Sequence, residues 1–194
     1  MESQHTEESG VIVTPDGKVV TADGLALKNV HRVELIDARL AQNVDANFHS
    51  WQVCRMVRRD FNFVSAKMFH QMAPKSTTTS VKEQIRGLVH EVRLQAELLV
   101  HACQAFESNP DPDIRVVPLR LVSPASSSLY KAFVYADVAY AKLNYAAESR
   151  KISPDDVHGY AQDFVLSFSD LKNYSIKSSS PKSAHELGIA QGIA

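Results

Sequence analysis

One run of the sequence, KSTTTSVK at residues 75–82, combines hydroxyl and cationic side chains in a way that suits phosphate binding. It stands at the start of a strongly patterned helix, where backbone N–H groups and the positive end of the helix dipole attract anions. Simple capping of the helix by the same hydroxyls is the alternative interpretation. The residues that we single out for phosphate contact are Lys75, Thr78, Thr79, Ser80 and Lys82.

A second run, NVHRVELIDARL at residues 29–40, has the alternation of a β-strand. An extended backbone would place Val33 and Leu35 on one face and the charged pair Arg32 and Glu34 on the other. A lone strand is unstable in water. We therefore predict that this segment pairs with the same segment of a second chain.

No catalytic fingerprint occurs in the sequence. The patterns GxGxxG, GK[S/T], HExxH and GxSxG are all missing. The two cysteines, Cys54 and Cys103, lie in apolar patterns that favour buried free thiols, and the eight histidines are too scattered to suggest a zinc site. The sequence therefore predicts that the protein is not an enzyme and uses no cofactor.

Charge is unevenly distributed along the 194 residues. The net charge of −1 divides into −4 for residues 1–27, +4 for residues 28–100 and −1 for residues 101–194. A basic middle is typical of nucleic-acid binding, although an ordinary solvated helix surface also explains it. The acidic start is unlike a signal peptide, and no apolar run approaches the roughly 20 residues that span a bilayer. We expect a cytoplasmic protein.

Hydrophobic periodicity predicts one mainly helical domain over residues 11–173, between a disordered acidic tail (1–10) and a flexible tail (174–194). Pro15-Asp16-Gly17 indicates a hairpin within residues 11–27. Ser80 and Glu83 form a capping box at the start of the strongest helix. The expected helices cover residues 43–61, 64–72, 80–107, 124–149 and 153–171, with a strand or extended connection over residues 113–124, where Pro118 argues against a central strand.

A strand, a helix and a second helix with an anion-binding start follow the order of a ribbon-helix-helix unit. In that fold two protomers pair their strands, and the resulting β-ribbon enters the DNA major groove. We expect such a unit in residues 28–107, elaborated by the helices of residues 108–173. The fold class predicted is therefore mainly α with a short N-terminal β-ribbon, as a homodimer.

Within that ribbon, Val33 and Leu35 are expected to form the core and dimer contact. Base edges would then face Lys28, Arg32 and Glu34. A register shifted by one residue would instead expose His31, Asp37 and Arg39, because side chains alternate between the two faces of a strand.

The sequence resembles the AcaB-like transcriptional regulators of conjugative plasmids and integrating elements. The resemblance rests on NVHRVELIDARLAQN before a Trp-containing helix and on SLYKAFVYADVAYAKLNYAAESRKISPDDVHGYAQDF after the long second helix, and it spans roughly residues 25–172. It implies a dimeric ribbon-helix-helix protein that binds double-stranded DNA and activates conjugative-transfer genes. The helices of residues 108–173 are expected either to extend the dimer interface or to contact RNA polymerase. The alternative is a helical protein–protein interaction or accessory conjugation protein without DNA binding.

Overall fold

The computed structural model describes residues 11–14, 19–21, 24, 26–73 and 78–177. The helices and strands in chain order are β1 (Val11–Val13), β2 (Val19–Thr21), α1 (Val30–Glu34), β3 (Gln42–Phe48), α2 (Trp51–Met56), η1 (Val57–Phe61), α3 (Asn62–Met72), α4 (Thr79–Ala102), β4 (Arg115–Leu121), α5 (Pro124–Glu148) and α6 (Pro154–Lys177). The protein is thus mainly helical, with two small antiparallel sheets.

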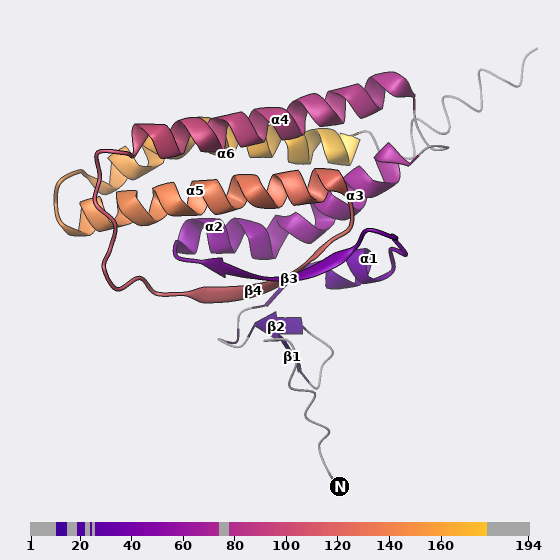
Figure 1. Ribbon diagram of the computed structural model, residues 1–194, viewed down its shortest axis with the longest axis horizontal. Coiled ribbons are helices and arrows are strands. Elements are labelled where there is room, and N and C mark those ends of the chain that lie inside the picture. Colours follow the sequence, from indigo (N-terminus) through magenta and orange to yellow (C-terminus); the bar gives the residue numbers. More distant parts are fainter. Residues whose placement is uncertain (1–10, 15–18, 22–23, 25, 74–77, 178–194) are drawn as a thin grey trace, which may run out of the picture.

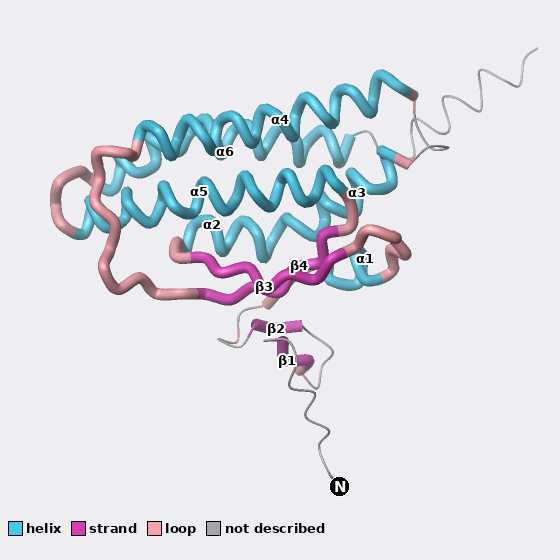
Figure 2. Tube along the Cα trace, in the orientation of Figure 1, coloured by secondary structure: helices cyan, strands magenta, loops and turns pink. Residues whose placement is uncertain are grey.

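Four helical rods form the body of the molecule (Figure 1). The first is continuous, because α2, the π-helical turn η1 and α3 follow one another without a break. Its direction is shared by α6, whereas α4 and α5 run the opposite way (Figure 1). Helices α4 and α5 are parallel because the chain between them crosses back along the bundle and includes β4 (Figure 2).

Aromatic side chains from three of the rods meet in the core. The ring of Phe133 on α5 makes edge contacts with Phe61, Phe164 and Phe168, at centroid distances of 6.3, 5.8 and 4.9 Å. All four side chains are buried. Burying a side chain of this size stabilises a fold by roughly 1.5–3 kcal/mol, so this cluster holds the rods together.

Strands β3 and β4 form the sheet that lies along the bundle (Figure 1). They are antiparallel, with Ala46 opposite Val117 and Val44 opposite Leu119. The alternate residues of both strands that face the helices are apolar, and those on the other face are mostly polar. In a two-stranded sheet both strands are edges, so Pro118 is tolerated there. Of the two alternatives for residues 113–124, a short strand or an extended connection, the structure shows the strand.

The predicted hairpin near the N-terminus is confirmed. Strands β1 and β2 pair antiparallel with Val13 opposite Val19, and the Pro-Asp-Gly turn itself lies outside the described residues. The amide of Leu27 donates to the Val19 carbonyl at 2.9 Å, which ties the hairpin to the segment that leads into α1.

The predicted strand over residues 29–40 is wrong. Residues Val30–Glu34 form the short helix α1, with Val33 1% exposed and Leu35 84% exposed. Val30, Val33 and Ile36 recur every three residues, which is helical spacing, and Val33 and Ile36 pack against buried residues of α3 and of the segment after β4. Leu35 is therefore neither core nor ribbon contact, and the strand that completes the sheet is β3.

Two other helix starts differ from the prediction. The segment expected to open a helix at residue 43 is β3, and the helix begins at Trp51 behind the cap Ser50. Helix α4 begins at Thr79 with Thr78 as its N-cap, so Ser80 lies inside the first turn and the predicted capping box is not formed there. Helices α5 and α6 start where predicted, but α6 continues to Lys177 instead of ending near 171.

Candidate nucleic-acid interface

The residues predicted to read bases lie beside the α2–α3 rod. The backbone N–H of Lys28 donates to the Arg58 carbonyl at 2.9 Å, and the Lys28 carbonyl accepts from Asn62 Nδ2 at 3.2 Å. Arg32 is exposed on α1, and Glu34 is exposed at the end of that helix. The alternative set, His31, Asp37 and Arg39, is exposed as well.

The residues predicted to contact phosphates lie elsewhere. Thr78, Thr79, Ser80 and Lys82 belong to the start of α4, which Figure 1 places across the bundle from α1. Lys75 lies outside the described residues. The structure therefore does not bring the two predicted halves of a DNA site together.

A row of basic residues, three of them cationic and one a histidine, follows one side of the α2–α3 rod. Arg55, Arg59, Lys67 and His70 are separated by four, eight and three residues, which keeps them on one side of a helix. All four are exposed or half-buried. Together with Arg32 of α1, these residues are called the basic face below.

Phe63 joins α1 to this row. The guanidinium carbon of Arg32 lies 5.4 Å from the centroid of the Phe63 ring, and Lys67 Nζ lies 5.8 Å from it. Cations at such distances are attracted by the ring face, with energies of about 0.5–1 kcal/mol at exposed sites. Arg32 Nε also donates to Asn29 Oδ1 at 3.1 Å. Two cations from different elements are thus held close together.

A groove of about 590 Å³ opens between α1 and α3 at the same place. Its lining includes His31 and Arg32 from α1 and Lys67 and His70 from α3. The cations Arg32 and Lys67 and two histidines thus border a concave surface, and that surface can admit an extended anion.

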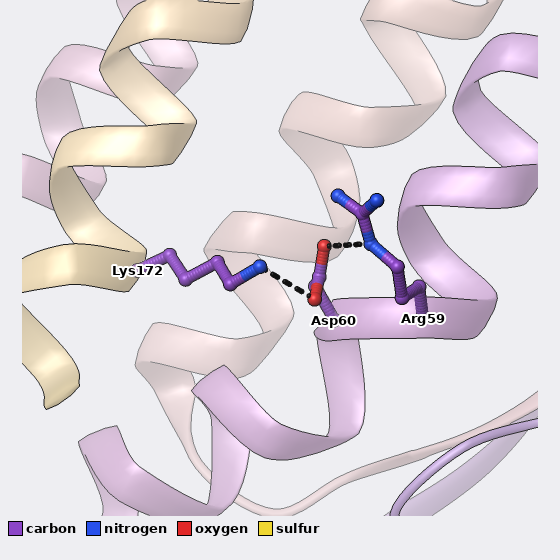
Figure 3. A network of polar contacts seen from close by, with 3 residues as sticks. All are labelled: Arg59, Asp60 and Lys172. Carbon is purple, nitrogen blue, oxygen red and sulfur yellow. Dashed lines mark hydrogen bonds and ion pairs between the residues drawn. The ribbon is translucent and has the colours of Figure 1, made fainter.

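The only acidic residue of the α2–α3 rod is Asp60, which is buried with its side chain 8% exposed. As Figure 3 shows, Asp60 Oδ2 accepts from Arg59 Nε at 2.7 Å and Oδ1 accepts from Lys172 Nζ of α6 at 2.8 Å. Asp60 belongs to the π-helical turn η1, where the wider winding changes the register of the helix. Its charge is therefore matched within the protein and does not oppose an anion on the basic face.

A second buried carboxylate, Asp137 of α5, fixes the start of the same rod. It accepts from the backbone N–H groups of His49 and Ser50, each at 2.8 Å, and from Ser50 Oγ at 2.6 Å. Ser50 Oγ in turn accepts from the Val53 N–H and caps α2. Asp137 therefore stabilises a helix N-terminus, where negative charge is favoured.

The basic face is the feature that the sequence interpretation missed. Arg55, Arg58 and Arg59 lie off the apolar stripe of their segment, which is the signal that could have indicated it. Arg58 differs from its neighbours because it is buried, with its guanidinium 5.6 Å from the ring centroid of Trp51. The row was missed because the sequence predicted two separate helices, over residues 43–61 and 64–72, whereas α2, η1 and α3 form one continuous rod.

The described part of the chain also shows the state of the cysteines, the possible metal ligands and the possible membrane-spanning helices. Both cysteines are free and buried, as predicted, and burial raises the pKa of the Cys103 thiol to about 11. No group of three or more His, Cys, Asp or Glu residues in the described ranges is placed to hold a metal ion. Among the helices of those ranges, none combines the length and apolarity that crossing a membrane requires.

Comparisons with known proteins identify no relative. No family, no curated protein and no solved structure matches the chain.

Proposed function

We propose that this protein binds double-stranded DNA through the basic face. The observation that carries the proposal is the row of basic residues on the α2–α3 rod, whose one acid is already paired inside the protein, together with Arg32 of α1. Phosphates of a duplex would displace counterions from this surface, which is the main source of affinity in such complexes.

Within this proposal Arg32 is the residue expected to contact bases. Its position on the Phe63 ring holds the guanidinium beside the groove between α1 and α3. An arginine can donate two hydrogen bonds to guanine O6 and N7, which is worth about 1–3 kcal/mol of discrimination. Arg55 and Lys67 are expected to contact phosphates.

The test is DNA affinity as a function of salt. We expect the chain to bind a labelled duplex with an affinity that falls steeply between 50 and 200 mM salt, which is a range where phosphate contacts are strongly weakened. Lys67→Gln should reduce the slope of log affinity against log salt by about 1. Lys131→Gln removes the same charge from the exposed side of α5 and serves as the matched control. Absence of binding at 50 mM salt, or an equal effect of the two variants, would overturn the proposal.

The resemblance to AcaB-like regulators adds a biological role to the proposal: activation of conjugative-transfer genes by a homodimer. RNA polymerase is a candidate partner of the C-terminal helices. A ribbon-helix-helix arrangement would require residues 29–40 to leave α1 and pair with a second chain, so the proposal uses the basic face and not a ribbon. Sedimentation equilibrium of the chain, with and without duplex, measures the predicted dimer.

The second candidate function is a protein–protein interaction module. It is favoured by apolar side chains exposed on α4, α5 and α6, among them Leu94 and Leu98 on α4 and Leu166 on α6. Exposed apolar surface of this kind marks contact sites when it is contiguous. An interaction module would show no salt-dependent retention on DNA, which separates the two functions in the same experiment.

A further inference from the structure

We propose that Asp60 is a positioning residue: it orients the Arg59 guanidinium so that its two terminal nitrogens can contact one phosphate of the bound duplex. This inference rests on the proposed function, and it assigns a specific task to a carboxylate that the sequence presents as an ordinary helix residue.

The geometry of the Arg59–Asp60 pair carries the inference. Asp60 Oδ2 engages Arg59 only through Nε, at 2.7 Å. In Figure 3 only Nε of Arg59 is joined to the carboxylate, and the two terminal nitrogens lie beyond that contact at the end of the side chain. The Arg59 side chain is 50% exposed, whereas that of Asp60 is 8% exposed. The donors left by this contact are the pair whose spacing matches two oxygens of a phosphate.

Asp60 itself is held in place from the other side. Lys172 Nζ of α6 donates to Oδ1 at 2.8 Å, and the backbone of the π-helical turn fixes the Cα position. A carboxylate restrained by two cations is a rigid support for a neighbouring side chain. An arginine that is already oriented loses less rotamer entropy on binding than one that is free to move, and this preorganisation increases affinity.

Charge alone predicts the opposite result from positioning. Replacing Asp60 by Asn removes a negative charge next to the basic face, so simple electrostatics would tighten DNA binding. Positioning predicts weaker binding, because a neutral amide oxygen holds the guanidinium less firmly than a carboxylate does. We expect Asp60→Asn to lower affinity about three- to tenfold, the range that corresponds to ordering one long side chain.

Arg59→Lys is the companion variant, since it keeps the charge and leaves the bond between Asp60 and Lys172 intact. It should fold even where Asp60→Asn does not, and it should lose affinity to a similar extent because an ammonium has no planar fork. The double variant should bind no more weakly than Arg59→Lys alone, because Asp60 acts only through Arg59. A merely structural role for Asp60 would not produce this non-additivity.

Titrations of a labelled duplex with the full chain and these three variants, in one low-salt buffer, measure all the required constants. The wild type must bind, or the proposed function fails. If the wild type binds and Asp60→Asn binds more tightly, or Arg59→Lys binds as well as the wild type, the positioning role is overturned while the proposed function stands.

Discussion

Two buried aspartates anchor the same helical rod, and they do so by different means. Asp137 accepts hydrogen bonds from two backbone N–H groups and a hydroxyl at the start of α2. Asp60, about three turns further along the rod, accepts only from the side chains of two cations. The first set of donors is fixed by the fold, whereas the second consists of long side chains that can reach water.

This difference in donors predicts different roles for the two aspartates. The backbone donors at Asp137 cannot move to another acceptor, so loss of the carboxylate leaves them without a hydrogen bond in the interior. The cations at Asp60 are partly exposed, with Arg59 50% and Lys172 29% accessible, and water can replace the carboxylate there. We therefore expect Asp137 to matter more for stability and Asp60 more for binding.

The largest effect should come from Asp137→Ala. This change leaves the N–H groups of His49 and Ser50 and the Ser50 hydroxyl without their acceptor, which should cost about 3 kcal/mol or more of the free energy of unfolding. Urea denaturation measures it. Asp163→Ala, a change at an exposed position of α6, is the control and should stay within about 0.5 kcal/mol of the wild type.

A smaller loss is expected for Asp60→Ala, about 1–2 kcal/mol in the same urea experiment, because both cations can be solvated once the carboxylate is gone. Added salt sharpens the comparison. In about 1 M salt the cost of Asp60→Ala should shrink because charged pairs near the surface are screened. The cost of Asp137→Ala should persist. A greater loss at Asp60 than at Asp137 would contradict the distinction drawn between the two sites.

The smallest effect should follow Lys172→Met, which keeps the aliphatic stem of the side chain and leaves Asp60 paired with Arg59. Partly exposed ion pairs are worth about 0–1 kcal/mol, so the unfolding free energy should fall by less than about 1 kcal/mol. Comparing the thermal unfolding of this variant with that of Asp60→Ala measures how much the bond from Lys172 of α6 contributes to stability. Equal losses for the two variants would show that Lys172 is the principal partner.

The starts of α5 and α6 were predictable from the sequence because their signals are local. The Ser-Pro-Asp-Asp start of α6 predicts a helix, and Asp156 does accept from the N–H and hydroxyl of Ser153 in the structure. Ser123 and Pro124 open α5 in the same manner. Caps and apolar periodicity act within one or two turns, so they can be read without knowing what the helix packs against.

The secondary structure of residues 29–48 was predicted wrongly because its signals depend on distant partners. Val44, Ala46 and Phe48 alternate with Asn43, Asp45 and Asn47, as a half-buried strand requires, but Val44 and Phe48 also fit a helical stripe. What makes the segment a strand is its pairing with β4, from which α2, η1, α3 and α4 separate it in the sequence. The contact between Lys172 and Asp60 could not be predicted for the same reason, because it joins residues that lie 112 positions apart in the sequence.

The pairing of β3 with β4 also constrains the order in which the molecule can assemble. During synthesis β3 leaves the ribosome well before β4, and α2, α3 and α4 must be made first. Closing so long a loop is entropically costly, and contacts of high sequence separation slow folding. The sheet should therefore form late, and a nascent chain that stops before Arg115 would expose the edge of β3 with no strand to cover it.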